Sequence, residues 1–330
     1  MTALAPHLTA FLRQHLPEER RASPATLDTY AHALRLLVCF AAERFGIRPS
    51  RLEVEQLDAS LVLDFLHHLE AGRKNSARTR NARLAAVNAL FRYLEYRLPS
   101  CLDQAQRIHA IPVKRTDETL VRHMTRDEVQ ALLDAPDPRT PTGVRDRAML
   151  HLAFAGGLRV SELVGLRLDQ LHFTPEPMLH VIGKGRRERI LPLWRETTVA
   201  LRAWLALRDG RQDLALFLNA AGHAMTRAGF EYILAKHAAA AARKQPSLGT
   251  KRITPHILRH SCAMHMLQAT RDIRRVSLWL GHASLQSTEI YLRADPTEKL
   301  EVLTAVAPPS LRRGQFRPPD ALIALLQESR

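Results

Sequence analysis

The sequence predicts a mainly helical α+β fold, divided into two domains, with one small β-hairpin among the helices. Apolar residues recur every three or four positions through most of the chain, as in amphipathic helices. The alternating pattern of strands is strongest in two short runs between Met178 and Leu193, which flank Gly183-Lys184-Gly185. A chain of 330 residues is long enough for two hydrophobic cores.

The composition indicates a globular protein with a polyanionic partner. Hydrophobic residues make up 46% of the chain, the formal net charge is +15, and the sequence pI is about 10.6. Residues 1–112 carry 15 basic and 11 acidic side chains, and the remainder carries 33 and 22. Both parts are therefore basic. Nucleic acid is the first candidate partner and a membrane surface the second.

Several classes of protein are disfavoured by what the sequence lacks. No apolar run approaches the length of a transmembrane helix, and the N-terminus lacks the pattern of a signal peptide. The three cysteines, Cys39, Cys101 and Cys262, form no metal-ligand pattern, and neither H-E-x-x-H nor C-x-x-C occurs. We therefore expect a cytoplasmic protein with reduced thiols, no metal, no cofactor and no membrane contact.

Residues 1–112 are predicted to form an all-helical domain. The last of its helices combines an apolar face with a strongly basic one, since the span 73–97 holds seven basic residues and one acidic residue. This pattern fits an ordinary solvated face, and it also fits a helix whose arginines meet DNA phosphates. The predicted helices span 8–16, 24–45, 59–70 and 77–96. The candidate DNA-binding residues are Arg73, Lys74, Arg78, Arg80 and Arg83.

A linker is predicted over Ile108–Thr119, because this segment lacks helical periodicity and contains Pro112. The second domain opens with a capping box that starts at Thr125. Its further predicted helices span 143–154, 197–207, 228–242 and 296–306, with a short edge strand at 216–218. The tail after residue 307 is broken by prolines and ends in an amphipathic segment, 320–326.

The segment from Thr254 to Tyr291 places several chemically useful side chains at helix starts. Thr254 and Pro255 are a good N-cap and first helical residue, so a helix carrying His256 and Arg259 on one face is expected. A second helix over 273–280 ends at Gly281 and is followed by His282. Ser284 is expected to cap a third helix, which carries Tyr291. Such helix N-termini suit a bound phosphate.

Single residues of this kind are usually structural, but the combined pattern resembles the tyrosine recombinase (phage integrase) family. H-x-x-R-H is followed by L-G-H and by a tyrosine nine residues later. Upstream lie G-x-R-x-S-E-L, which contains Arg159, and G-K-G-R-R-E-R-I-L-P-L, which contains Lys184. Glu162 fits two roles, a partner that holds Arg159 or a first-turn acid. The resemblance implies the catalytic set Arg159, Lys184, His256, Arg259, His282 and Tyr291.

The resemblance also implies the domain organisation. An N-terminal SAM-like core-binding domain would occupy 1–112 and a tyrosine recombinase catalytic domain 113–307. Residues 308–330 would form a tail able to exchange between protomers. The partners would be double-stranded DNA with specific recombination sites, and a homotetramer or a hetero-assembly with related recombinases.

The implied reaction is phosphoryl transfer to Tyr291 without metal. Two arginines would clamp the nonbridging oxygens, and His256 would take the phenolic proton. Lys184 would protonate the leaving 5′-hydroxyl, while His282 would hydrogen-bond a nonbridging oxygen. The product would be a 3′-phosphotyrosyl link.

Four functions remain open on the sequence. An integrase acting in integration or transposition of a mobile element is favoured by the L-W-L-G-H-x-S pattern and the proline-rich tail. An Xer-type resolvase of chromosome or plasmid dimers is the nearest alternative. A type IB topoisomerase would use a similar tyrosine without site preference. A catalytically idle DNA-binding protein is disfavoured, because every site position is filled.

Overall fold

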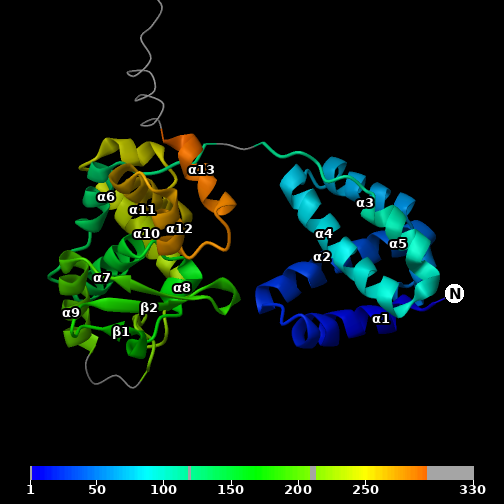
Figure 1. Ribbon diagram of the computed structural model, residues 1–330, viewed down its shortest axis with the longest axis horizontal. Coiled ribbons are helices and arrows are strands. Elements are labelled where there is room, and N and C mark those ends of the chain that lie inside the picture. The colour runs from blue at the N-terminus through cyan, green and yellow to red at the C-terminus, as the bar shows by residue number, and fades with distance from the viewer. Residues whose placement is uncertain (1, 118–119, 209–212, 296–330) are drawn as a thin grey trace, which may run out of the picture. The chain divides into compact units, whose positions relative to one another are not determined.

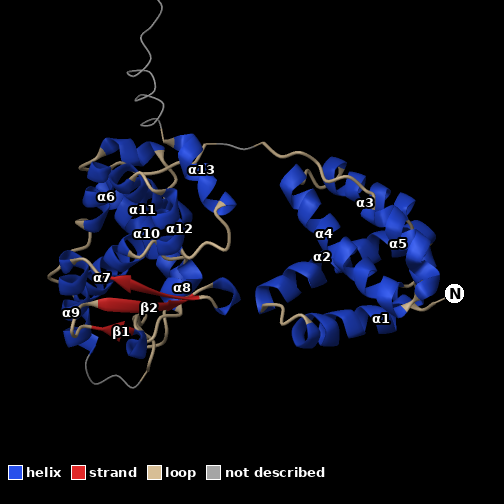
Figure 2. Cartoon of the chain, in the orientation of Figure 1, coloured by secondary structure: helices blue, strands red, loops and turns tan. Residues whose placement is uncertain are grey.

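The computed structural model describes residues 2–117, 120–208 and 213–295, and it divides the chain into two compact units, Met1–Glu118 and Thr119–Arg330. Within these residues most of the chain is helical, and the three-stranded antiparallel sheet lies in the second unit (Figures 1 and 2). The predicted fold class is therefore confirmed. Within the same residues, no helix is long and apolar enough to cross a membrane.

The first unit is built from five α-helices and short helical turns. Helix α2 begins at Ser23, whose hydroxyl accepts a hydrogen bond from the Thr26 N–H, and ends at Gly46 with φ of +65°. The α-helices are α1 (Leu4–Ala10), α2 (Pro24–Phe45), α3 (Ala59–Ala71), α4 (Ala77–Arg97) and α5 (Leu102–His109). The other helical elements are η1 (Phe11–Glu19), η2 (Pro49–Arg51), η3 (Val54–Gln56) and η4 (Pro99–Cys101).

Two parts of the first unit differ from the sequence prediction. The helix predicted over 8–16 is α1 followed directly by the π-helix η1, so helical structure starts earlier and ends later. Helix α5 was not predicted. It is only eight residues long, and its last two residues, Ile108 and His109, fall in the segment predicted as the linker. The core joins these helices through large apolar side chains such as Phe11, Phe65 and Phe91.

The predicted linker, 108–119, begins inside helix α5, and its middle part is held against the first unit. Arg80 donates a hydrogen bond from Nη1 to the Pro112 carbonyl at 2.7 Å. Asn81 donates to the Lys114 carbonyl at 2.8 Å, and the Lys114 ammonium lies 2.9 Å from Glu70. The stretch from Pro112 to Lys114 is therefore extended chain fixed on α3 and α4.

The second unit surrounds one buried helix. Helix α7 (Pro141–Ala155) has 11 buried residues among its 15, and its apolar side chains belong to a core shared with α6, α9, α10 and α11. The other α-helices are α6 (Arg126–Leu133), α8 (Val160–Val164), α9 (Arg195–Arg208), α10 (Arg227–Ala241), α11 (Pro255–Thr270), α12 (Ile273–Leu280) and α13 (Gln286–Ala294). Short 3-10 turns are η5 (Leu168–Gln170), η6 (Lys184–Arg186) and η7 (Pro246–Thr250).

The predicted hairpin is present and gains a third strand. Strand β2 (Met178–Ile182) pairs antiparallel with β3 (Glu188–Pro192) and also with β1 (Leu171–His172). The turn η6 joins β2 to β3, so Lys184 lies at the tip of the hairpin. Leu179, Val181 and Leu191 are buried on the core side.

The edge strand predicted at 216–218 was wrong. These three residues are buried, yet this segment takes part only in isolated bridges and not in the three-stranded sheet. The Leu216 N–H donates to the Leu166 carbonyl, and the Leu216 carbonyl accepts from the Trp204 indole. The apolar run is explained by burial in the core and not by membership of the sheet.

Candidate active site

Arg159 follows a tight turn at the end of α7. Gly157 has φ of +53°, and a Cβ atom built there would lie 2.6 Å from Leu280 Cδ2. Glycine is therefore required both by the backbone conformation and by the close approach of α12. The turn places Arg159 directly before α8.

Arg259 is buried where three segments meet. As predicted, Thr254 caps α11 by accepting from the Ile257 N–H, and Pro255 is the first helical residue. The Arg259 side chain donates from Nη1 to the Gly157 carbonyl at 2.5 Å and from Nη2 to the Leu280 carbonyl at 2.8 Å. Burial lowers the pKa of Arg259 to about 10, so it stays charged at neutral pH. A guanidinium has five N–H donors, and these two bonds leave others for a ligand.

Glu162 is the anion shared by the arginines of the site. Its carboxylate accepts from Arg159 Nη1 at 2.6 Å and from Arg189 Nη2 at 2.8 Å, and it lies 3.9 Å from Arg259 Nη1. It also accepts from the Arg159 backbone N–H at 3.1 Å. Burial alone would raise the pKa of Glu162, but the hydrogen bonds and charges of Arg189 and Arg159 outweigh it and lower the pKa. Both roles considered for Glu162 are therefore present.

The Glu162–Arg189 pair also packs against two glycines. A Cβ atom at Gly281 would lie 2.9 Å from Arg189 Nη1, and one at Gly183 would lie 3.1 Å from Glu162 Oε1. These glycines immediately precede His282 and Lys184 in the chain. One ion pair thus supports the backbone beside two of the predicted catalytic residues. Lys184 itself is the first residue of the turn η6.

Tyr291 is buried in α13, with an exposed fraction of 1%. Its hydroxyl is hydrogen-bonded to His260 Nδ1 at 2.9 Å, and its ring lies edge-on to that imidazole. Burial raises the pKa of Tyr291 to about 12. The predicted cap of this helix was wrong: α13 begins at Gln286, and the Ser284 hydroxyl contacts the Ser287 hydroxyl and not a backbone N–H.

The two predicted histidines occupy different environments. His282 Nδ1 lies 2.8 Å from the buried Thr288 hydroxyl, and the His282 ring stacks on Tyr291 at 6.4 Å. Burial, together with the nearby positive charges of Arg259 and then Arg159, lowers the pKa of His282 to about 4. His256 is exposed, whereas Arg259, three residues later on the same helix, is buried.

The structure adds Arg189 and His260 to the neighbourhood predicted from the sequence. His260 lies inside the quoted H-x-x-R-H pattern, but spacing alone does not reveal that it reaches Tyr291. Arg189 occupies the same face of β3 as the buried Leu191, because side chains alternate along a strand. The role of Arg189 could have been suspected from the sequence, because an arginine on the inward face of a hairpin strand needs a buried partner.

Arg80 differs from the other predicted DNA-binding residues. Arg73, Lys74 and Arg78 are exposed and Arg83 is half-buried, but Arg80 is only 4% exposed. Since its Nη1 is bonded to Pro112, Arg80 holds the chain after α5 and presents little charge to a partner. The prediction for Arg80 is corrected on this ground.

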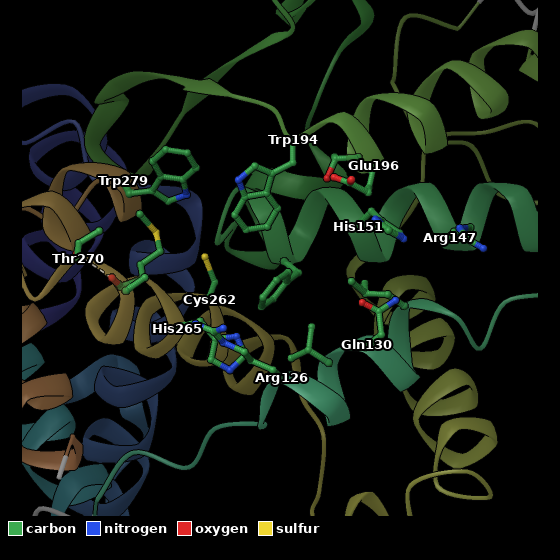
Figure 3. A pocket seen from close by; sticks show the side chains of 16 residues that line it. Arg126, Gln130, Arg147, His151, Trp194, Glu196, Cys262, His265, Thr270 and Trp279 are labelled. Carbon is green, nitrogen blue, oxygen red and sulfur yellow. Dashed lines mark hydrogen bonds between the residues drawn. The ribbon is translucent and has the colours of Figure 1, made fainter. Parts of the chain in front are cut away.

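A separate pocket of about 670 Å³ lies between α6, α7 and α11 (Figure 3). Trp194 and Trp279 lie on one side, and His265 and Cys262 on another. His151, which is 7% exposed, also lines it. Within the part of the chain that the structure describes, no group of His, Cys, Asp or Glu side chains could hold a metal ion.

Comparison with known proteins defines the class. Residues 122–298 match the phage integrase family, and residues 8–97 match the phage integrase N-terminal SAM-like domain. The protein named "Putative integrase/recombinase y4rC" from Sinorhizobium fredii is 44% identical, covering 98% of each chain. The tyrosine recombinase XerC of Escherichia coli O157:H7 is 35% identical, over 96% of this chain and 100% of the relative. The chain therefore belongs to the phage integrase family of tyrosine recombinases, which are DNA-cutting and rejoining enzymes.

The fold agrees with that assignment. The crystal structure of the XerH site-specific recombinase in a post-cleavage complex with its palindromic difH substrate has a TM-score of 0.65 to this chain. The two are 23% identical, and the match covers 89% of this chain and 83% of that one.

Proposed function

We propose that this protein is a site-specific recombinase that cuts and rejoins DNA through a 3′-phosphotyrosyl link to Tyr291. The observation that carries the proposal is the convergence of a buried tyrosine with Arg159, Arg259 and His282 at one place. We further propose 1–112, 113–307 and 308–330 as its core-binding domain, catalytic domain and tail.

The arginines supply the electrostatic part of the reaction. Attack on a phosphodiester increases negative charge on the nonbridging oxygens, and a guanidinium matches their geometry with paired N–H donors. Arg159 and Arg259 are held in register by Glu162 and by the carbonyls of Gly157 and Leu280. In this proposal they do the work that Mg²⁺ does in other phosphoryl transfers, and His282 hydrogen-bonds a nonbridging oxygen of the phosphate.

Tyr291→Phe is expected to abolish covalent attachment to DNA while leaving DNA binding intact, because the ring stays and the nucleophile is lost. The full chain is incubated with nicked, sheared host DNA in EDTA, and protein-linked DNA is resolved on a denaturing gel. An adduct that survives the substitution would disprove the role of Tyr291.

The same reaction is expected to need no divalent metal, and EDTA tests this. Wild-type activity that is absent in EDTA and restored by Mg²⁺ would disprove metal independence.

Lys184 is proposed as the acid that protonates the leaving 5′-oxygen. A lysine at a hairpin tip can reach that atom, and a 5′-phosphorothiolate needs no proton to leave. Lys184→Ala should therefore cleave an ordinary site slowly and a phosphorothiolate site at close to the wild-type rate. Arg159→Ala is the control, and it should stay slow on both substrates because it stabilises charge. If the phosphorothiolate does not rescue Lys184→Ala, then Lys184 binds phosphate or DNA and is not the acid.

The biological role proposed is integration or transposition of a mobile element. The relatives' names support both an integrase/recombinase and an Xer-type role, and the proline-rich tail favours the former. Covalent capture in the host genome separates the two. Cut sites at the ends of a repeated element support this role, whereas one chromosomal site supports a dimer resolvase. Relaxation of plasmids regardless of sequence would instead indicate a topoisomerase-like enzyme.

The exposed basic residues near the start of α4 are proposed to contact DNA phosphates. Arg78→Ala should weaken binding of the full chain to captured-site DNA and lower the salt dependence by about one counterion. Arg80→Ala is the matched control in the same helix. It should destabilise the first unit by about 1–3 kcal/mol, because it removes a buried hydrogen bond, and leave the salt slope unchanged. Thermal unfolding followed by circular dichroism measures the stability. Equal effects of both changes on the salt slope would contradict the proposal.

Assembly is proposed to use the tail, which lies outside the described residues, as does the helix predicted at 296–306. Leu322, Ile323, Leu325 and Leu326 form an apolar stripe in the sequence. We assign this stripe to the aromatic-walled pocket of Figure 3 on an adjacent protomer in a tetramer. A fully buried large apolar side chain contributes roughly 1.5–3 kcal/mol before ordering costs.

Deleting residues 310–330 should leave binding to a single site unchanged but impair pairing of two sites and strand exchange. Ala269→Arg, at an exposed position of the pocket, should have the same effect. If tails dock between protomers, mixing the two defective proteins restores some pairing, because one supplies the tail and the other the pocket. No restoration on mixing would mean that the tail packs within its own chain.

A further inference from the structure

His260 is hydrogen-bonded to the proposed nucleophile, although no role was predicted for it from the sequence. Its Nδ1 lies 2.9 Å from the Tyr291 hydroxyl, and the two rings meet edge to face with centroids 5.6 Å apart. His256, which was predicted to take the phenolic proton, is exposed, and its ring centroid lies 6.3 Å from that of His260. His256 and His260 lie on the same helix, α11, and His260 is the one that is bonded to Tyr291.

Two tautomers of His260 are compatible with this bond, because a phenol can donate or accept. When the phenol donates, Nδ1 accepts and the hydrogen of the imidazole is on Nε2, and this is the arrangement that proton transfer to Nδ1 requires. The pKa of His260 is lowered to about 4, mainly by burial. The positive charges of His256, when it is protonated, and of Arg259 also lower this pKa. The imidazole is therefore neutral at physiological pH, as a proton acceptor must be.

We propose that His260 is a catalytic residue, which accepts the phenolic proton of Tyr291 as that oxygen attacks the phosphodiester. The inference rests on the proposed function of Tyr291. The O–H bond of Tyr291 breaks, its proton passes to Nδ1, and the O–P bond forms. The bond from phosphorus to the 5′-oxygen breaks, and that oxygen receives a proton from the acid, assigned above to Lys184. In rejoining, the imidazolium returns its proton to the tyrosine oxygen.

The charges around the pair explain why the transfer awaits substrate. The titratable and charged groups facing it are His256, Arg259 and Cys262 on α11, Arg159 before α8, and His282 between α12 and α13. Without DNA the proton stays on the phenol, because burial raises the pKa of Tyr291 to about 12. A bound phosphodiester brings negative charge, which favours the imidazolium. Tyr291 is 1% exposed, so α13 has to shift before the hydroxyl can attack DNA. The proposal requires that the bond to His260 is kept, or formed again, after this shift.

The test compares His260→Ala and His260→Asn with His256→Ala. Asparagine offers an oxygen near the position of Nδ1, so it can accept the hydrogen bond but cannot take up the proton. Single-turnover adduct formation is measured on a nicked duplex built from a captured site. Both His260 variants should bind this DNA normally and react about 10²–10⁴-fold more slowly. Adduct formation by His260→Asn at close to the wild-type rate would overturn the proposal.

A change in the nucleophile separates proton removal from a structural defect. Placing 3-fluorotyrosine at position 291 lowers the phenol pKa, so less help from a base is needed. This replacement should raise the rate of His260→Ala by a larger factor than that of His256→Ala or the wild type. Rescue confined to His256→Ala would identify His256 as the base and overturn the proposal. A Tyr291→Phe protein that still forms the adduct would instead refute the proposed function itself.

One measurement does not depend on the folding of a variant. Long-range ¹H–¹⁵N spectra of the full wild-type chain at neutral pH should show His260 with its hydrogen on Nε2. Tyr291→Phe, which removes only the hydroxyl, should shift the Nδ1 resonance. A hydrogen on Nδ1 would mean that the imidazole donates to Tyr291, and it would exclude His260 as the acceptor.

Discussion

The buried carboxylate of Glu162 is the interaction on which the site depends. It accepts hydrogen bonds from Arg159 and Arg189 and lies near Arg259, so one negative charge sits among three positive charges. Without it, these guanidinium groups would repel one another in a region of low dielectric. The arrangement leaves a net positive charge, which is what an anionic substrate requires. Glu162 thus keeps the cluster stable without cancelling its attraction for phosphate.

This cluster is positioned by the packing of the second unit. Helix α7 is buried on nearly all sides, and the turn at its end sets the backbone of Arg159 and the carbonyl bound by Arg259. Gly157 allows α12 to approach that turn, and Gly183 and Gly281 leave room for the Glu162–Arg189 pair. Removing one partner of a buried ion pair is costly, because the other charge is left without compensation. The same contacts therefore serve the stability of the unit and, in the proposed mechanism, catalysis.

Most elements were predictable because their signals are local. The capping box at Thr125, the cap at Thr254 and the hairpin around Gly183 depend on neighbouring residues, and the structure contains all three. Contacts between distant segments were not predictable in this way. His260 meets Tyr291 across 31 positions of sequence, and Arg80 is buried by a segment 32 positions away. Helical periodicity predicts which face of a helix is buried, but it does not predict which residues pack against that face.

The burial of Tyr291 also has a meaning for the host cell. An enzyme that can open the DNA backbone is a hazard whenever its nucleophile is free to react. Here the hydroxyl is shielded and already bonded, and it lies on α13, the last helix among the described residues. In the proposed mechanism, strand breakage therefore requires a rearrangement that exposes this hydroxyl. Such a requirement would limit unwanted breaks in the genome that carries the enzyme.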